Sequence, residues 1–152
     1  MNDVYEITEG EFLISTDFNK IQLDVIHHYL SQESYWAQNI PFEVVEKSAK
    51  NSLCFGVYHQ NKQIGFARVT TDKSTFAYLA DVFIIKEYRG NGLSKWLIKT
   101  IHSHHDLQGL RRWMLGTKDA HGLYRQFGWT EIPDDLMPRF MQIFNPDVYK
   151  KL

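Results

Sequence analysis

An apolar stretch at residues 76–85 is followed within a few residues by two glycines and then by an amphipathic segment. Such an apolar run is typical of a central strand that is covered on both faces of its sheet. After the glycines, core-type residues recur at offsets 0, 3, 4, 7 and 8 from Leu93, the spacing of one helix face. The sequence therefore predicts a central strand, a tight glycine turn and a helix over residues 92–102, in direct succession.

The other elements follow from the same periodicities and from the turn residues between them. Strands are predicted over residues 5–15, 53–58, 63–71, 112–115 and 139–144, the second and third of these joined as a hairpin. Helices are predicted over residues 18–30, 41–50 and 120–127. Asp17 and Asp119 are the expected N-caps of the first and last of these helices, and Gly128 the expected stop. This order predicts a mixed sheet with helices on both faces, in one domain over residues 1–152.

Composition excludes several classes of function. With 152 residues, of which 43% are hydrophobic, the chain can bury a core without disulfides or metal. Its net charge of −1 gives no overall field for nucleic acid or an anionic membrane. Cys54 is the only cysteine, which excludes an internal disulfide and favours a reducing compartment. No apolar run reaches the ~20 residues of a membrane span, and no secretory signal is visible. We expect a cytoplasmic protein with no nucleic-acid or membrane partner.

The glycine turn is suited to binding phosphate, because free amides at a helix N-terminus attract anions and glycines let the backbone approach them. A dinucleotide-binding G-x-G-x-x-G motif fails here, because Lys95 occupies the last glycine position. No window supplies the P-loop pattern G-x-x-x-x-G-K-[ST]. The pattern that remains is Arg-x-x-Gly-x-small, formed by Arg89, Gly92 and Ser94, in which the Arg89 charge also suits phosphate.

These residues resemble the acetyl-CoA-binding motif of the GCN5-related N-acetyltransferase (GNAT) superfamily, Gln/Arg-x-x-Gly-x-Gly/Ala, with Ser94 in place of Gly or Ala. Residues 120–129 resemble a late segment of the same family that contains a tyrosine, here Tyr124, and ends in Gly-Phe/Trp. Thr117 stands where many members have an asparagine that contacts CoA. The resemblance implies an α/β (α+β) fold, with a mixed, largely antiparallel sheet of about six to seven strands flanked by about four helices.

The resemblance also implies where acetyl-CoA binds. The backbone of one strand segment is expected to pair with the pantetheine arm, and the amides of the glycine turn to hold the pyrophosphate. The strand segment is Val82, Phe83 and Ile84; the turn is Arg89, Gly90, Asn91, Gly92, Leu93, Ser94 and Lys95. Tyr124 matches the family's tyrosine that protonates the CoA sulfur, and its place on a predicted apolar helix face also fits a core residue.

Asp81 interrupts the apolar strand just before the pantetheine segment, where a carboxylate is costly unless it is paired or functional. Two interpretations carry equal weight: a catalytic base for the amine, or a salt bridge to a neighbouring strand, with Arg68 as partner. Trp36 and His121 are candidates for contact with the acceptor, although packing or solvent exposure explains either one as well. Cys54, within an apolar run, is expected to be a buried, inert thiol.

No metal site is predicted, because His27-His28 and His104-His105 are adjacent pairs, and neighbours on a helix point apart. The function expected from the resemblance is N-acetyltransfer from acetyl-CoA directly to a primary amine of a small molecule, an amino acid, a peptide or a protein. The alternative is a non-catalytic CoA- or acyl-CoA-binding sensor or interaction module with the same fold. The sequence leaves open whether the chain is a monomer or a homodimer.

Overall fold

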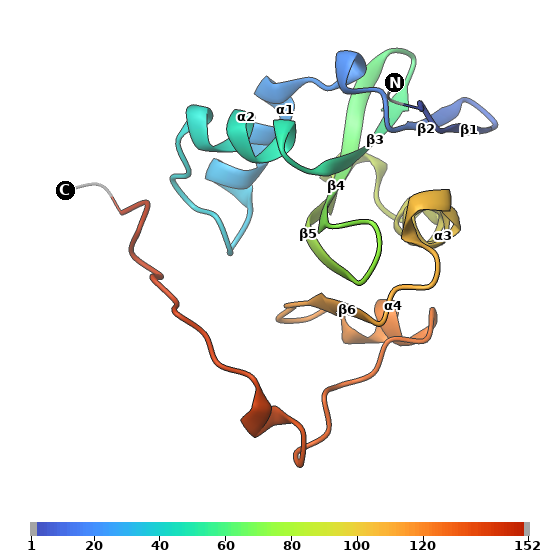
Figure 1. The fold of residues 1–152 in the computed structure, drawn as a ribbon. Helices are drawn as coiled ribbons and strands as arrows, with labels where there is room; N and C mark the ends of the chain where they lie inside the picture. The colour runs from blue at the N-terminus through green and yellow to red at the C-terminus, as the bar shows by residue number, and fades with distance from the viewer. Residues whose placement is uncertain (1–2, 151–152) are drawn as a thin grey trace.

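Within residues 3–150, six strands form one sheet, in which every strand lies beside its neighbours in the chain (Figure 1). The computed structural model describes residues 3–150. Antiparallel pairing joins the first five strands, and the last pair is parallel. In order, the strands are β1 (Glu6–Glu9), β2 (Phe12–Ser15), β3 (Leu53–His59), β4 (Lys62–Thr71), β5 (Phe76–Ile84) and β6 (Arg112–Leu115). The predicted mixed, largely antiparallel sheet is confirmed.

Four α-helices accompany the sheet: α1 (Leu23–His28), α2 (Phe42–Lys50), α3 (Leu93–Ser103) and α4 (His121–Arg125). A π-helical turn over Tyr29–Glu33 continues α1, and the Ser34 amide donates to the Tyr29 carbonyl at 2.9 Å. Short 3₁₀ turns lie at Phe18–Lys20, Lys86–Tyr88, His105–Leu107 and Met137–Arg139. No helix within residues 3–150 is both long and apolar enough to cross a membrane.

The core has two parts, one on each face of the sheet. Alternate residues of the strands supply the two parts, as the period of two in a strand requires: Phe55 and Ala67 face α3, whereas Cys54 and Phe66 face α1 and α2. The α3 part is buried against Leu97, Ile98 and Ile101, and the other part against Ile26, Leu30 and Val45. Helices therefore cover both faces, as the sequence predicts.

Residues 5–15 do not form one strand. They form the hairpin of β1 and β2, with Gly10 at φ +60° in the turn between them. Residues 18–30 also break, into a 3₁₀ turn and the shorter α1, and Asp17 caps the 3₁₀ turn through the Asn19 amide at 3.0 Å. The break occurs because Gln22 bonds to Gln63 of β4 in both directions, at 2.8 and 3.1 Å, which fixes the chain in an extended form before α1.

Helix α4 is shorter than predicted, and Asp119 is not its N-cap. Ala120 takes that position, and the Thr117 hydroxyl accepts a hydrogen bond from the Ala120 amide at 3.1 Å. Gly128 has φ +90°, the left-handed conformation expected of the residue after a helix.

The strand predicted over residues 139–144 is absent: beyond the 3₁₀ turn at Met137–Arg139 the chain is extended but pairs with no strand within the described range. It runs outside the rest of the fold toward α2 (Figure 1).

β5 is not covered on both faces along its whole length. Ala77 and Leu79 pack under α3, but Phe76 and Tyr78 on the opposite face are 36% and 41% exposed. The apolar run therefore predicts the strand correctly and overestimates how far helices cover it.

Gly65 of β4 lies where a side chain has no room. A Cβ there would meet Cδ1 of Ile84 at 2.6 Å and the Phe83 carbonyl oxygen at 3.0 Å, whereas one at Gly122 meets nothing within 4 Å. We expect Gly65→Ala to lower the free energy of unfolding by about 1–3 kcal/mol, because β4 and β5 must move apart. Chemical denaturation measures this, with Gly122→Ala as the control that leaves stability unchanged or raises it by up to ~1 kcal/mol. Equal stability of the two variants would contradict the packing.

Candidate active site

β5 extends well past the end of β6, so one of its edges is open. The parallel register runs from Phe76 opposite Arg112 to Leu79 opposite Leu115, and β5 then continues to Ile84. The Ile85 amide donates to the Ile64 carbonyl of β4 at 2.8 Å. Because alternate residues of a strand direct their polar groups to opposite sides, the backbone of Ile84 turns toward the open edge. An extended ligand could add to β5 at this edge.

A β-bulge lies where the edge opens. Phe66 pairs with Phe83 and Arg68 pairs with Ala80, so two residues of β5 face one residue of β4. Asp81 is in this bulge at φ +56°, a left-handed conformation that Asp tolerates better than most residues. A bulge bends its strand and re-aims its side chains, and here it points the Asp81 carboxylate toward Arg68.

Both oxygens of the Asp81 carboxylate have partners. Oδ2 accepts from Nε of Arg68 at 2.9 Å, and Oδ1 accepts from Nε1 of Trp36 at 2.8 Å. The Asp81 side chain is 10% exposed and that of Arg68 is 20% exposed. The salt bridge that the sequence suggested is confirmed, and the same carboxylate brings Trp36 to the bulge.

A cleft of about 540 Å³ begins at this bulge, between β5 and the loop that follows β6. Tyr35 closes one side of it: its hydroxyl accepts from the Lys118 amide at 2.8 Å, and the Lys118 ammonium lies 5.6 Å from the centre of its ring. The cleft is lined by Tyr35, Trp36, Tyr78, Leu79, Ala80, Asp81, Val82, Leu115, Gly116, Thr117, Lys118 and Tyr124. The structure thus brings four predicted residues, Asp81, Val82, Trp36 and Tyr124, into one cavity.

Tyr124 projects from α4 into this cleft. Its residue is 7% exposed, and its ring packs edge-on against Trp129 with centroids 5.8 Å apart. Burial raises the pKa of Tyr124 to about 12, and no hydrogen bond of its hydroxyl contributes to this shift. The side chain is therefore both a core residue and an available proton donor, as the two compatible interpretations of the sequence allow.

The glycine turn before α3 offers a row of unpaired amides. Gly90 and Gly92 have φ +84° and +74°, which turns the backbone before the helix begins at Leu93. The first backbone hydrogen bond of α3 is donated by the Trp96 amide to the Gly92 carbonyl at 3.1 Å. No side chain caps the N-terminus of α3. The amides of residues 90–95 thus have no acceptor in residues 3–150. A Cβ at either glycine would meet nothing within 4 Å, so this side of the turn is open.

Arg89 differs from its predicted role at two points. Its amide already donates to the Lys86 carbonyl at 3.2 Å, so the row of free amides starts at Gly90. Its guanidinium donates to the Ile84 carbonyl at 3.0 Å and to the Tyr29 hydroxyl at 2.9 Å, and therefore turns to the open edge of β5 rather than to the glycine turn. Tyr29 stacks on Phe83 with centroids 4.0 Å apart. Arg89 consequently connects the glycine turn with the edge of β5 at Ile84 and with the π-helical turn at Tyr29.

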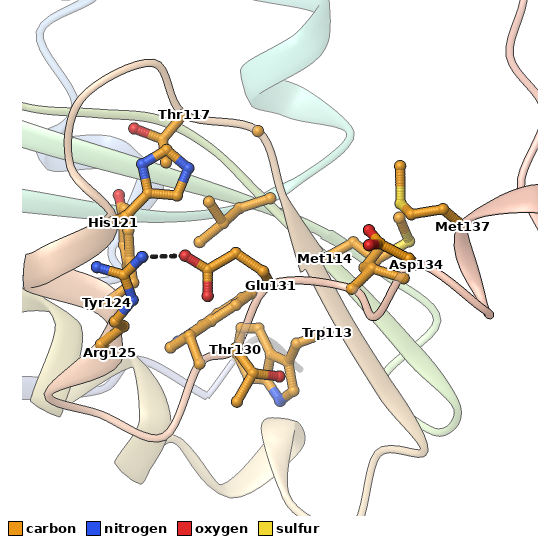
Figure 2. A pocket seen from close by; sticks show the side chains of 14 residues that line it. Trp113, Met114, Thr117, His121, Tyr124, Arg125, Thr130, Glu131, Asp134 and Met137 are labelled. Atoms are coloured by element: carbon orange, nitrogen blue, oxygen red, sulfur yellow. Dashed lines mark hydrogen bonds and ion pairs between the residues drawn. The ribbon is translucent and has the colours of Figure 1, made fainter.

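His121 does not lie in the cleft of Asp81 and Trp36. It lines a second cavity of about 450 Å³ between β6, α4 and residues 129–137, which Figure 2 shows with Trp113 and Met114 on one wall and His121, Tyr124 and Arg125 on another. Arg125 forms an ion pair with Glu131 beside this cavity and lowers the pKa of that carboxyl. Since Leu115, Gly116, Thr117 and Tyr124 line both cavities, the two are neighbours, and His121 lies on the far side of Tyr124.

The remaining predicted groups lie away from the cleft. Cys54 is 4% exposed, which confirms the expected burial, and burial raises the pKa of its thiol to about 12. The reason given against metal at His104 and His105 is wrong, because both lie at a 3₁₀ turn and their rings stack at 4.4 Å. With Asp106 they place three ligand-type atoms within 4.8 Å. Nδ1 of His104 already accepts from the Asp106 amide, and Lys73 lies 3.5 Å from the Asp106 carboxylate.

Several cleft residues carry no signal in the sequence that could have identified them. Tyr78, Leu115 and Lys118 enter the cleft only because β6 stops opposite Leu79, and this is a consequence of strand length in space rather than of a local pattern.

Comparison with known proteins agrees with this geometry. The family model of the acetyltransferase (GNAT) domain matches residues 50–131. A protein of Gibberella zeae assigned as an acetyltransferase is 33% identical, with 77% of each chain covered. The crystal structure of a GNAT-family protein from Xanthomonas campestris superposes with a TM-score of 0.87 at 42% identity, covering 99% of each chain.

A structure from Clostridium acetobutylicum, assigned as an acetyltransferase and solved with acetyl-CoA, shares the fold at a TM-score of 0.61 and 9% identity, covering 93% of this chain and 95% of that one. The open strand edge, the glycine turn and the tyrosine of α4 thus occur in a chain that belongs to the GNAT family of acetyltransferases.

Proposed function

We propose that the protein transfers the acetyl group of acetyl-CoA directly to a primary amine of a small molecule, an amino acid, a peptide or a protein. The observation that carries this proposal is the alignment of the open β5 edge with the unpaired amides of residues 90–95 at one end and the Tyr124 cleft at the other. The acetyl-CoA bound by the Clostridium acetobutylicum protein of the same fold supports the choice of donor.

The chain's own groups fit this donor. Amides at the N-terminus of an α-helix bind phosphate through direct hydrogen bonds and the helix dipole, so residues 90–95 would hold the pyrophosphate. Along Val82, Phe83 and Ile84, the backbone groups that face the open edge would pair with the pantetheine amides as an added strand does, except the Ile84 carbonyl, which accepts from Arg89. The thioester would then lie in the cleft beside Tyr124.

In the reaction, the neutral amine nitrogen attacks the thioester carbon, a C–N bond forms as the C–S bond breaks, and the amine loses a proton. A lysine-like amine has a pKa of about 10.4, so making it neutral at pH 7 costs roughly 4–5 kcal/mol. The departing thiolate takes its proton from the Tyr124 hydroxyl, and the resulting tyrosinate regains a proton from solvent. The raised pKa of Tyr124 keeps that hydroxyl protonated at neutral pH, and burial raises the pKa of a thiol in the same cleft as well.

Asp81 acts in this proposal as a positioning residue. Its carboxylate already accepts from Arg68 and Trp36, so it holds the bulge and fixes one wall of the cleft. Water in the cleft then carries the amine proton to solvent. Trp36, held by this bond and 41% exposed, presents an aromatic surface to the acceptor.

Replacement of Tyr124 by Phe should remove the proton donor and keep the ring. The packing against Trp129 remains, and no hydrogen bond within the described residues is lost. We expect the turnover number to fall about 10²-fold or more, while the dissociation constant of acetyl-CoA stays within about twofold. Steady-state kinetics and calorimetric titration measure the two quantities. Unchanged turnover would remove Tyr124 from the reaction.

In the parent protein, turnover should not decline up to about pH 10, because the folded pKa of Tyr124 lies above that.

Asp81→Asn tests whether Asp81 is a positioning residue or the base that takes a proton from the amine. Asn tolerates the left-handed conformation but leaves Arg68 without its anionic partner, so we expect unfolding to become easier by about 1–3 kcal/mol. The rising limb of the pH–rate profile should keep its midpoint. Arg68→Met combined with Asp81→Asn is the control, and its loss of stability should be smaller than the sum of the single losses. A rising limb that moves or disappears in Asp81→Asn would make Asp81 the base.

Ligand-induced stabilisation separates this function from other uses of a glycine turn. At a hundredfold excess over its dissociation constant, a ligand stabilises the fold by about 2.7 kcal/mol, a rise in Tm of roughly 5–10 °C. Acetyl-CoA and CoA should produce such a rise, and NAD and ATP at equal concentration a much smaller one. Release of free thiol in the presence of a panel of amines then distinguishes an enzyme from a CoA-binding module. Binding without turnover across the panel would favour the module.

A further inference from the structure

The cleft of Asp81 and Trp36 carries one positive charge that its own residues do not balance. Asp81 and Lys118 are the only residues of its lining with a formal charge. The Asp81 carboxylate is balanced by Arg68 at 2.9 Å, and its second oxygen accepts from Trp36. Lys118 forms no ion pair within residues 3–150. An acceptor in this cleft therefore meets a cation and no free carboxylate.

Tyr35 holds Lys118 beside the cleft. The Lys118 amide donates to the Tyr35 hydroxyl at 2.8 Å, and the ammonium of the same residue lies 5.6 Å from the centre of the Tyr35 ring. Attraction between a cation and the face of an aromatic ring acts within about 6 Å. Both the backbone and the charged head of Lys118 are thus placed against a side chain that lines the cleft.

Three aromatic side chains give the cleft apolar walls. Tyr35, Trp36 and Tyr78 line it and are 49%, 41% and 41% exposed. The rings of Tyr35 and Trp36 meet edge-on with centroids 5.0 Å apart, and Tyr78 comes from β5. Exposed aromatic rings in a concave site offer a surface for the apolar part of a ligand. An acceptor that fits this cleft combines an apolar body and an anionic group with its amine.

We propose that the acceptor is a free amino acid with an apolar or aromatic side chain, and that Lys118 binds its α-carboxylate. This step rests on the proposed acetyl transfer and narrows its acceptor. One ammonium balances the single charge of a carboxylate, whereas a phosphate monoester carries about −1.5 to −2 at pH 7. The cleft volume of about 540 Å³ is also that of a site for a small molecule.

The same charge disfavours the other acceptors. A diamine or polyamine would bring a second cation close to Lys118, and like charges repel. The amine of a peptide N-terminus or of a lysine side chain has no carboxylate beside it, because that carboxyl group is part of an amide bond. A free amino acid carries the amine, the carboxylate and the side chain on one carbon atom. Lys118 is therefore the residue that determines acceptor specificity.

Binding of acetylated products to the full-length protein, saturated with CoA, tests this without the reaction. N-acetylphenylalanine is compared with N-acetylphenethylamine, and N-acetylleucine with N-isopentylacetamide. The members of each pair differ only in the carboxylate, and the acetylated nitrogen does not titrate. We expect the carboxylate member to bind about 10-fold more tightly by calorimetric titration, as a charge-assisted hydrogen bond provides.

Variants of Lys118 locate the origin of this preference. Lys118→Met removes the charge and keeps the backbone amide that bonds to Tyr35, so the preference should fall to about twofold or less. Lys118→Arg should retain most of it, and Lys118→Glu should reverse it. Lys99→Met, at an exposed position on α3 outside the lining of the cleft, is the matched control and should leave the preference unchanged. Circular dichroism confirms that each variant folds.

Three results would overturn the inference: equal binding within both pairs, binding of no product, or a preference that survives in Lys118→Met. Turnover is measured separately, as release of free thiol with phenylalanine and leucine as acceptors. Acetyl transfer to amines without any preference for a carboxylate would refute this inference alone. Product binding that depends on Lys118, without turnover, would refute only the proposed acetyl transfer.

Discussion

The ion pair between Arg68 and Asp81 fixes the irregularity in β5 on which the candidate site depends. Together with the bond from Trp36, the pair compensates a left-handed aspartate in the middle of a sheet, a conformation that costs of order 1–3 kcal/mol. The pair holds the bulge, the bulge bends β5, and β6 ends at the same level. Beyond Leu79, β5 therefore has no partner strand on this side within the described residues, and the Asp81 carboxylate also fixes Trp36 beside this edge.

A single arginine connects the parts of the site that lie far apart in the sequence. Arg89 begins the glycine turn, bonds to the Ile84 carbonyl at the strand edge and reaches the Tyr29 hydroxyl. Tyr29 in turn lies flat on Phe83. The glycine turn, the open edge of β5 and the π-helical turn that precedes Trp36 are therefore connected through the contacts of Arg89 and Tyr29. The Arg89 side chain, which the sequence predicted to lie near phosphate, therefore contacts the strand edge and Tyr29 in this structure.

Local patterns predicted what local physics decides. The apolar run, the two glycines and the spacing from Leu93 determine a strand, a turn and a helix through short-range preferences, and the structure has all three. The isolated carboxylate at Asp81 correctly indicated a partner. Long-range contacts decided the rest. The bonds between Gln22 and Gln63 interrupted a helix with a good apolar stripe, and strand lengths placed Tyr78 and Lys118 in the cleft. The cavity that His121 lines could not be inferred from the sequence, because it depends on where β6 lies relative to α4.

The π-helical turn at Tyr29–Glu33 holds about one residue more per turn than an α-helix would. This extra residue sets the direction in which the chain leaves the turn at Ser34. Each residue of an α-helix advances the chain by about 100° around the axis. Deleting one residue there would let the turn tighten into an ordinary helix and rotate the following loop by about a quarter of a circle. Tyr35 would then swing off Lys118, and the indole of Trp36 off the bulge. The number of residues in the π-helical turn thus sets the orientation of the loop with Tyr35 and Trp36. Chain length in this short stretch therefore matters more than the identity of its exposed side chains.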